Sequence, residues 1–446
     1  MNTKNHRINS EGHLEIAGVN TTLLAEKYGT PLFVYDVQDI CERAKAFQQA
    51  FEEEQVRYQV AYASKAFSCI AIVQLMDELG LSLDVVSGGE LYTALQAGFP
   101  VERIHFHGNN KSPDEIEMAV KAGVGCFVVD NFHELTWLMA ITQSLETKMN
   151  VLLRITPGVE AHTHEYISTG QEDSKFGFDI SSGQAEKAIQ QVVSDERLHL
   201  LGFHCHIGSQ IFETDGFVSA VDEIFQHLVE WRDTTGYCPE VLNLGGGFGI
   251  RYSKGDEPLP LGDYVKAMIE AVKNHTERHS FSIPEIWIEP GRALVGEAGT
   301  TLYTVGARKS IPGVRDYVSV DGGMTDNIRP ALYQAKYEAV VANKGDAPTT
   351  DTVSIAGKCC ESGDMLIWDL KVPFIEQGDL LAVKSTGAYG YSMANNYNRI
   401  QRPAVVFLQD NQDYCVIERE TYQQMTQLDR PWNRNGKKTE VLVKSS

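Results

Sequence analysis

The sequence predicts an α/β protein that combines a (β/α)8 TIM-like barrel with a mostly antiparallel β domain. Eight short apolar runs alternate with segments of helical length over about 240 residues, which is the pattern of parallel strands joined by helices. From about residue 297 onward, strand-like runs follow one another with Gly and Asp turns between them. We expect the barrel to span 37–296 and the β domain to comprise 297–446 together with 1–36. A doubly wound open sheet is the structural alternative.

The chain before the barrel holds a polar start, a short strand-like run and a helix-like stretch that ends near Pro31. Residues 32–35 (LFVY) are the next expected strand, which we expect to pair with the β domain, and a helix should follow from about residue 36 to 51. The eight barrel strands are expected at 59–63, 81–86, 103–107, 126–129, 151–155, 200–206, 241–244 and 285–289.

Two stretches between these strands are distinctive. Apolar residues recur every three or four positions from 217 to 231, which predicts an amphipathic helix. Residues 158–178 are long and irregular, and loops of that length in compact domains are usually functional or disordered. We therefore expect 158–178 to be an active-site loop.

Charge and cysteine content narrow the function classes. The 446 residues include 39 Lys+Arg and 60 Asp+Glu, and the net charge of −21 argues against nucleic acid or an anionic membrane surface as a partner. No apolar run reaches the roughly 18 residues of a membrane span. Eight cysteines without a CxxC pair suit reduced thiols. We expect a soluble, cytoplasmic protein.

The candidate chemistry lies where the expected strands end, because the carboxyl ends of barrel strands meet at one face. Lys65 follows the first strand, His206 and Ser209 follow the sixth, and Glu289 and Arg292 follow the eighth. A glycine run at 245–249 follows the seventh strand but lacks the G-x-G-x-x-G spacing of a dinucleotide site. It is either a tight turn or a cradle for a single phosphate, in which Gly246 and Gly247 would lie near Arg292.

Three HxH pairs, at 105/107, 162/164 and 204/206, have the spacing of metal ligands on a strand. Suitable carboxylates and a water-activating group are not convincingly placed around them, so no metal is expected, although a metal-dependent barrel hydrolase stays open as an alternative. A lysine for a Schiff base, a phosphate cradle and an acidic partner for a ring nitrogen are instead the parts that pyridoxal phosphate requires. Burial beside cationic groups should lower the pKa of Lys65 and favour its neutral, nucleophilic form.

Nine motifs stand in a fixed order along nearly the whole chain: YASKAF, DVVSGGEL, HGNNKS, HCHIGSQI, LNLGGGFG, EPGR, DNIRPALY, CCESGD and GAYGYSM. With them the sequence resembles the diaminopimelate decarboxylase family, a member of the alanine-racemase-like, fold type III group of pyridoxal phosphate enzymes. The resemblance implies pyridoxal 5'-phosphate as cofactor. Lys65 would carry it, His206 would stack on its ring and Glu289 would pair with its pyridine nitrogen. The other cofactor-binding residues would be Ser209, Gly246, Gly247, Pro290, Gly291, Arg292 and Tyr389.

The implied reaction converts meso-2,6-diaminoheptanedioate to L-lysine and carbon dioxide, the last step of lysine biosynthesis. Cys360 would be the catalytic acid, and related enzymes supply it together with Glu361 from a second subunit, so a homodimer with shared active sites is implied. On the residues alone, Arg329 also fits a surface turn and Tyr333 also fits sheet packing. A decarboxylase for ornithine, arginine or carboxynorspermidine is the alternative within the class. The residues that would bind the substrate are Arg292, Arg329, Tyr333, Glu361 and Tyr389.

Overall fold

The computed structural model describes residues 5–159 and 174–432. Most of the stretch 158–178, which we expected to be an active-site loop, therefore lies outside the described residues. None of the helices within the described ranges is long and apolar enough to cross a membrane.

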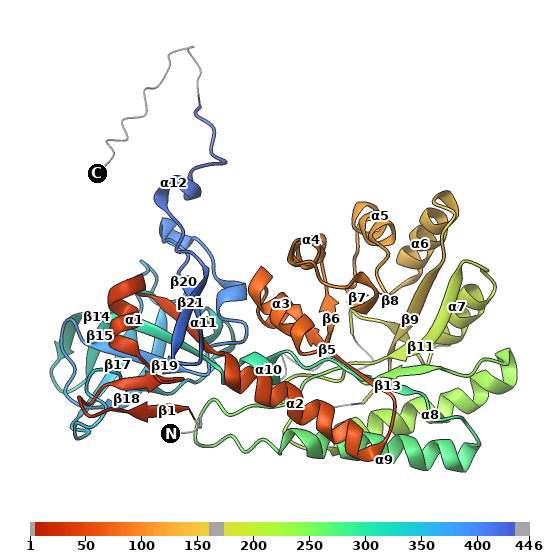
Figure 1. The fold of residues 1–446 in the computed structure, drawn as a ribbon, viewed down its shortest axis with the longest axis horizontal. Helices are drawn as coiled ribbons and strands as arrows, with labels where there is room; N and C mark the ends of the chain where they lie inside the picture. The colour runs from red at the N-terminus through yellow and green to blue at the C-terminus, as the bar shows by residue number, and fades with distance from the viewer. Residues whose placement is uncertain (1–4, 160–173, 433–446) are drawn as a thin grey trace.

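Eight parallel strands form a closed barrel, as predicted. Each strand pairs with its neighbours, and the pairing of the fourth strand with the fifth joins the whole set into one ring. The barrel lies to the right in Figure 1, with its helices around the outside. In ring order the strands are β5 (Tyr58–Ala63), β6 (Ser82–Val85), β7 (Ile104–Phe106), β8 (Cys126–Val129), β9 (Met149–Thr156), β11 (Leu198–His204), β12 (Val241–Asn243) and β13 (Glu285–Ile288).

The strands form because they are short, continuous apolar runs, as expected of parallel strands that are covered on both faces. All four residues of β8 are buried, for example. A two-residue strand, β10 (Phe178–Asp179), pairs with the carboxyl end of β9 and was not predicted. The helices that cover the barrel are α2 (Val37–Glu54), α3 (Ile70–Glu78), α4 (Gly88–Ala97), α5 (Pro113–Ala122), α6 (Phe132–Ser144), α7 (Gln184–Val193), α8 (Asp215–Thr235) and α9 (Leu261–His279).

Local signals fix the ends of these helices. The Asp36 side chain accepts hydrogen bonds from the first turn of α2 and begins that helix. Helix α2 continues through three glutamates beyond residue 51, where the sequence predicted its end, because glutamate is a good helix former, and it stops at Gln55 in a left-handed conformation (φ 54°). The predicted amphipathic helix is α8, and its periodic apolar residues are buried against the barrel.

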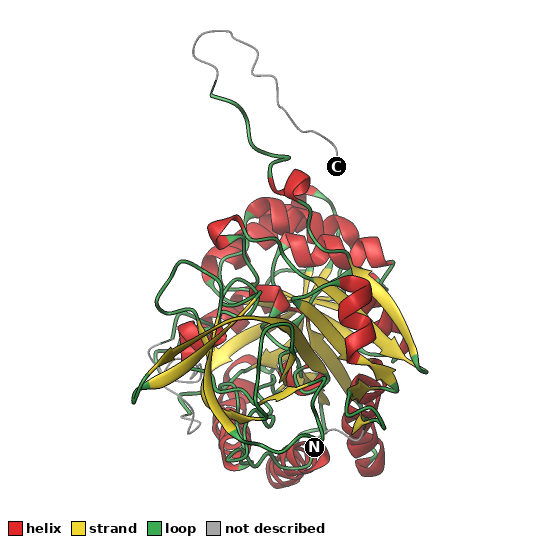
Figure 2. Cartoon of the chain, turned by 90° about the vertical axis from the view of Figure 1, so that its left-hand side faces the viewer, coloured by secondary structure: helices red, strands yellow, loops and turns green. Residues whose placement is uncertain are grey.

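The second unit is a mostly antiparallel sheet, again as predicted; Figure 2 views the molecule from its side. Strand β4 (Leu32–Asp36) pairs with two of its strands, which confirms the expected pairing of 32–35 with this domain. The remaining strands of the sheet are β14 (Gly299–Ile311), β15 (Arg315–Val320), β16 (Ala339–Val341), β17 (Asp351–Ala356), β18 (Met365–Val372), β19 (Leu380–Lys384), β20 (Ala404–Gln409) and β21 (Gln412–Ile417).

Smaller elements complete the chain. Three short strands near the N-terminus make a separate small sheet, and a helix leads from it to β4. These elements are β1 (His6–Ile8), β2 (Leu14–Ile16), β3 (Val19–Asn20) and α1 (Thr21–Tyr28), and the short helices of the C-terminal half are α10 (Arg292–Val295), α11 (Arg329–Tyr333) and α12 (Tyr422–Met425).

The two units meet directly behind Lys65. The Phe67 ring stacks on Tyr35 of β4, with ring centroids 4.6 Å apart, and its edge contacts Tyr391 of the β domain. The Tyr389 N–H donates to the carbonyl of Ala66 at 2.8 Å. The β domain therefore packs against Ala66 and Phe67, the residues that directly follow Lys65.

Candidate active site

Lys65 lies in a single 3-10 turn, Ser64–Ala66, at the carboxyl end of β5, and its side chain is exposed at this end of the barrel. Although the side chain is solvent-accessible, the surrounding protein partly desolvates its amine, which lowers the Lys65 pKa; Tyr389, Asp84 and Glu289 act in the opposite direction, and the net effect raises the pKa above its ordinary value. The prediction that the Lys65 pKa is lowered is therefore wrong. The cause is that the charges around the amine are mainly acidic, whereas the prediction assumed cationic neighbours.

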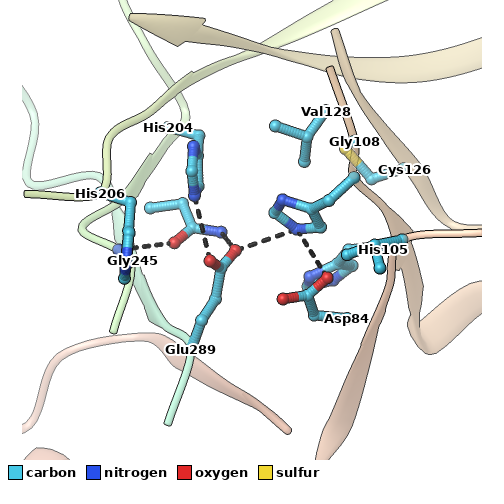
Figure 3. A network of polar contacts seen from close by, with 12 residues as sticks. Asp84, His105, Gly108, Cys126, Val128, His204, His206, Gly245 and Glu289 are labelled. Atoms are coloured by element: carbon cyan, nitrogen blue, oxygen red, sulfur yellow. Dashed lines mark hydrogen bonds and ion pairs between the residues drawn. The ribbon is translucent and has the colours of Figure 1, made fainter. Parts of the chain in front are cut away.

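Glu289 directly follows β13 and is buried, and three side-chain nitrogens approach its carboxylate. His204 Nε2 lies 3.0 Å from Oε2, while His107 Nε2 at 3.0 Å and Asn243 Nδ2 at 2.6 Å both approach Oε1. Figure 3 shows Glu289 between His204 and the side of the site that carries Asp84. Strands β11, β12 and β13 and the residue that follows β7 supply this set, because their carboxyl ends meet inside the barrel.

The surroundings of Glu289 favour its ionised form. Burial alone raises a carboxyl pKa, but the hydrogen bonds and charges of His107 and His204 hold the pKa of Glu289 well below its usual range. Burial is also the main reason that the pKa of His204 falls to about 4. At neutral pH His204 is therefore a neutral imidazole, and its Nε2–H can donate to the carboxylate.

The glycine run after β12 makes a backbone cradle. A Cβ on Gly246 would lie 2.1 Å from the carbonyl oxygen of Glu289, and one on Gly247 (φ 105°) would lie 2.3 Å from that of Gly208. Only glycine fits at both positions. Pro290 accepts a hydrogen bond from the Ala63 N–H, and a Cβ on Gly291 would touch Ala63 at 3.0 Å.

His206 borders the same cradle. Its Nδ1 accepts a hydrogen bond from the Gly246 N–H at 3.2 Å, which fixes the orientation of the imidazole. Burial lowers the pKa of His206 well below its ordinary value, so the ring is neutral. A neutral, oriented and flat side chain beside a backbone cradle suits contact with the face of an aromatic ring.

Of the two HxH pairs in the described part of the chain, neither brings both of its histidines to Glu289. His107 and His204, which belong to different pairs, meet at Glu289, and their ligand atoms and the carboxylate lie within 4.8 Å of one another. His105 stacks on Trp287 instead, with ring centroids 4.3 Å apart. Residues 162 and 164 lie outside the described part of the chain. Both imidazoles contact the Glu289 carboxylate, His204 through a hydrogen bond at 3.0 Å and His107 through an ion-pair contact at 3.0 Å.

Two arginines approach each other across Tyr252. The Arg292 guanidinium donates to the Ser209 hydroxyl at 2.9 Å and to Tyr252 at 2.5 Å, and the Arg329 guanidinium lies 4.8 Å from the Tyr252 ring centroid. Arg329 also donates to Tyr337 at 2.6 Å. Both arginines are at most 9 % exposed, and neither forms an ion pair with a carboxylate of the described ranges. Buried guanidiniums without acidic partners are ready to bind anions.

Tyr389 closes one side of this cluster. Its ring lies 4.8 Å from the Arg292 guanidinium, and its backbone has a positive φ of 59°, which is uncommon for a bulky residue. Such strain often marks a functional position. The hydrogen bond from its N–H to Ala66 stabilises this conformation.

Three predicted site residues lie apart from this cluster. Cys360 and Glu361 are exposed in the turn between β17 and β18, and the described hydrogen bonds of this pair stay within the β domain. Tyr333, at the end of α11, is 42 % exposed. One chain thus brings Lys65, His206, Glu289 and the two arginines together and leaves Cys360, Glu361 and Tyr333 at its surface.

Several residues of the site were missed by sequence reasoning. Neither Asn243 nor Tyr252 was predicted as a site residue, although Asn243 lies in the LNLGGGFG motif; the fold brings them to Glu289 and to the arginines. Asp84 and His107 were given no role in the site, although they lie in the DVVSGGEL and HGNNKS motifs and His107 belongs to one of the HxH pairs. The Nε2 of His107 that contacts Glu289 also lies 3.7 Å from Asp84 Oδ1.

The residues fit pyridoxal phosphate. An ionised carboxylate can hold a ring nitrogen, a neutral imidazole can lie against the ring, and glycine N–H groups with Ser209 and Arg292 can hold a phosphate. A side chain at Gly246 or Gly247 would fill the cradle. The buried Nε of Arg292 has no partner among the described residues, which leaves it free for an anion.

Comparison with known proteins agrees with this reading. The family model for the pyridoxal-dependent decarboxylase, pyridoxal binding domain, matches residues 37–296. The fold and the site together therefore define a pyridoxal phosphate-dependent decarboxylase. Over the whole chain, the diaminopimelate decarboxylase of Halalkalibacterium halodurans is 67% identical over 425 residues, covering 95% of this chain and 97% of that protein. The diaminopimelate decarboxylase of Bacillus subtilis is 64% identical over 431 residues, covering 97% of this chain and 98% of that protein. The chain belongs to the diaminopimelate decarboxylase family.

A solved structure gives the same result. The diaminopimelate decarboxylase of M. jannaschii in complex with L-lysine superposes with a TM-score of 0.90 at 37% identity, covering 96% of this chain and 98% of that one. A lysine/ornithine decarboxylase of Vibrio vulnificus, at 22% identity and a TM-score of 0.72, shares the fold.

Proposed function

We propose that the protein decarboxylates meso-2,6-diaminoheptanedioate to L-lysine and carbon dioxide with pyridoxal 5'-phosphate as cofactor. The observation that carries the proposal is the pair of buried guanidiniums, Arg292 and Arg329, without a carboxylate partner among the described residues. A cofactor phosphate needs one cationic group, and a substrate with a second carboxylate needs another. The family to which the chain belongs supports the same substrate.

Each residue near the cofactor has a separate task. Lys65 would hold the cofactor through its amine, and Glu289 would accept a hydrogen bond from the ring nitrogen. His206 would contact the ring face, while Ser209, Gly246, Gly247 and Arg292 would bind the phosphate. The bound cofactor supplies a conjugated ring that accepts the electron pair released when carbon dioxide leaves. The Glu289 carboxylate would stay ionised for this hydrogen bond because it is contacted by His107, His204 and Asn243.

Substrate selection would depend on the distal carboxylate. Arg329 would bind it, with Arg292, Tyr333 and Tyr389 nearby. A site built to pair a carboxylate discriminates against a substrate that lacks one, because the buried guanidinium then loses its hydration without gaining a partner. L-lysine and ornithine are therefore expected to be poor substrates.

The active site would be completed by a second subunit. Exposure of Cys360 and Glu361 away from the Lys65 site of the same chain supports a homodimer in which these residues enter the opposite barrel. The partner subunit's Cys360 would deliver a proton to the carbon that loses carbon dioxide. The partner subunit's Glu361 would bind the distal ammonium of the substrate.

The cell compartment and the domain boundaries belong to the same proposal. All eight cysteines are free thiols, which suits the reducing cytoplasm. The division at 37 and 297 is supported by the barrel elements, which begin with α2 at Val37 and end with α10 at Val295, and by the pairing of β4 with the β domain.

The reaction and the substrate are tested together. Purified protein loaded with pyridoxal phosphate is given meso-diaminopimelate, L-lysine or ornithine, and carbon dioxide release and product identity are measured. We expect release and L-lysine formation with meso-diaminopimelate alone. Equal turnover of ornithine would contradict the role given to Arg329. No turnover of meso-diaminopimelate by the loaded protein would contradict the function itself.

The shared site is tested by mixing chains. Lys65→Ala and Cys360→Ala homodimers should each be inactive or nearly so, whereas a purified heterodimer of the two contains one intact site. We expect that heterodimer to recover activity approaching half of the wild-type value per dimer. An inactive heterodimer would show that each chain uses its own Cys360.

A further inference from the structure

Two loops of the β domain carry the substrate-side residues. Residues 321–328 connect β15 to α11 and lead directly to Arg329, and residues 357–364 connect β17 to β18 and carry Cys360 and Glu361. A backbone hydrogen bond from the Lys358 N–H to the Gly322 carbonyl, at 2.9 Å, shows that the loops lie side by side. We refer to them as the arginine loop and the cysteine loop.

Asp364 links the two loops through its carboxylate. Oδ1 accepts a hydrogen bond from the Met324 N–H of the arginine loop at 2.6 Å. Oδ2 accepts one from the Cys359 N–H of the cysteine loop at 2.8 Å. Asp364 is only 3 % exposed, so these bonds are sheltered from water.

The backbone around Asp364 is shaped to admit the carboxylate. A Cβ on Gly323 would lie 2.5 Å from both carboxylate oxygens, and one on Gly357 would lie 2.1 Å from Oδ2. One glycine comes from each loop. Both loops therefore close on the Asp364 side chain at distances that other residues would not permit.

A third segment supports the cysteine loop. The Cys360 N–H donates to Asn398 Oδ1 at 2.8 Å, and Asn398 itself has a positive φ of 52°. The Asn395 N–H donates to the carbonyl of Thr325 in the arginine loop at 2.8 Å. The segment that contains Tyr389 thus contacts both loops, and the backbone N–H groups of Cys359 and Cys360 each have a side-chain acceptor.

We propose that Asp364 is a positioning residue that couples the two active sites of the dimer: it places Arg329 in the site of its own chain and Cys360 in the site of the partner. The proposal rests on the proposed function, in which these two residues serve different sites. A single carboxylate would then control substrate binding in one site and proton delivery in the other.

The test uses heterodimers with one intact site. One chain carries Cys360→Ala and supplies Lys65 and Arg329; the other carries Lys65→Ala and supplies Cys360. Asp364→Asn is introduced into one chain or the other. In the Cys360-supplying chain we expect kcat to fall on the order of 10–100-fold with KM unchanged, because misplacing a reacting group acts on the chemical step. In the Lys65-supplying chain we expect KM for meso-diaminopimelate to rise on the same scale with kcat much less affected.

Asp379→Asn is the matched control. Asp379 is also buried in the β domain (4 % exposed) and also accepts a backbone N–H, that of Glu376 at 2.8 Å, but it contacts neither loop. Asp379→Asn should give no difference between the two placements. If Asp364→Asn prevents dimer formation, Asp364→Glu, which keeps the charge but shifts the carboxylate, is measured in the same two placements.

The outcomes are distinct. Opposite effects on kcat and KM in the two placements support the coupling. Equal effects in both placements, no effect, or the same split with Asp379→Asn overturn it while leaving the proposed function intact. An inactive heterodimer without any Asp364 substitution overturns the shared site, and the coupling with it.

Discussion

Asn243 is a neutral residue that contacts both the Glu289 carboxylate and the glycine cradle. Its Nδ2 donates to Glu289 at 2.6 Å, and its Oδ1 accepts the N–H of Gly245 at 3.0 Å, so it connects the carboxylate to the glycine cradle. An amide can serve both roles because it carries a donor and an acceptor. An aspartate of the same shape could accept the Gly245 N–H but could not donate a hydrogen bond to Glu289.

Replacing Asn243 with Asp tests this role. The new carboxylate beside Glu289 would raise the Glu289 pKa, because two like charges at hydrogen-bond distance disfavour ionisation. We expect kcat to fall on the order of 100-fold at neutral pH and the acidic limb of the kcat–pH profile to move to higher pH. A profile of unchanged shape would argue that Asn243 acts through packing. Asn150→Asp, at the exposed amino end of β9, serves as the control.

The residue scale also shows where sequence reasoning reached its limit. Lys65 and Glu289 could be predicted because each follows an apolar run at a strand end. The direction of the Lys65 pKa shift could not, because Asp84, Glu289 and Tyr389 come from three distant parts of the chain. Tyr252 was missed for the same reason, since its contact with Arg329 depends on how the β domain packs on the barrel.

Among the elements, the loop after β12 carries the strictest sequence requirement. Gly247 has a φ of 105°, and its missing side chain leaves room for the carbonyl of Gly208. The loop after β11 can approach only because of this glycine. The two loops then form one cradle between strands six and seven of the barrel.

Gly247→Ala should therefore weaken cofactor binding more than it affects the fold. The Cβ would force the Gly208 carbonyl to move and would turn the cradle N–H groups away from a phosphate. We expect the dissociation constant for pyridoxal phosphate to rise on the order of tenfold or more, since lost charge-assisted hydrogen bonds each contribute about 1.5–3 kcal/mol. Titration followed by the visible absorbance of the bound cofactor measures it.

Gly255→Ala is the control for this substitution, because a Cβ at Gly255 meets nothing within 4 Å. Its dissociation constant should match that of the unmodified protein. An unchanged constant for Gly247→Ala would mean that the cradle does not bind the phosphate.

Element order was predictable from the sequence, whereas some element ends were not. Each barrel strand is a short, mainly buried run between segments of helical length, so its position could be read directly, and the closed order of strands follows from regular alternation with helices. The end of α2 was predicted three residues early because polar glutamates look like the start of a loop. Strand β10 is too short, at two residues, to leave a pattern.

In the molecule as a whole, the N-terminal sheet, the barrel and the β domain meet around His6. The imidazole is 7 % exposed and shares a small cavity with Arg251, Glu297, Glu338 and Lys384. Burial, and then the charge of Lys384, lower the pKa of His6 to about 4. The native state therefore contains His6 in its neutral form.

This arrangement predicts a loss of stability in acid. His6 is protonated near pH 6.5 in the unfolded chain but only near pH 4 in the folded chain. The contribution of neutral His6 to the free energy of unfolding is therefore complete above about pH 6.5 and is lost as the pH falls toward 4. Between pH 7 and pH 5 we expect a loss of about 2 kcal/mol from this residue. Hydrogen exchange of the N-terminal strands at the two pH values measures it.

His6→Asn should remove that part of the pH dependence, because asparagine does not titrate in this range. His199→Asn, a substitution of a histidine whose side chain is 56% exposed, should leave it in place. The same change in protection between pH 7 and pH 5 in the His6→Asn variant would rule His6 out as the cause.

The position of β4 has a consequence for the newly made chain. Its five residues, LFVYD, are all buried in the finished protein, yet the first strand they pair with, β14, lies about 260 residues later. At roughly 5–20 residues per second, ribosomes take roughly 10–50 s to make that length. An apolar strand without its neighbours is open to pairing with other chains during this interval. The earliest strand of this sheet therefore stays without its native partners while the barrel is being synthesised.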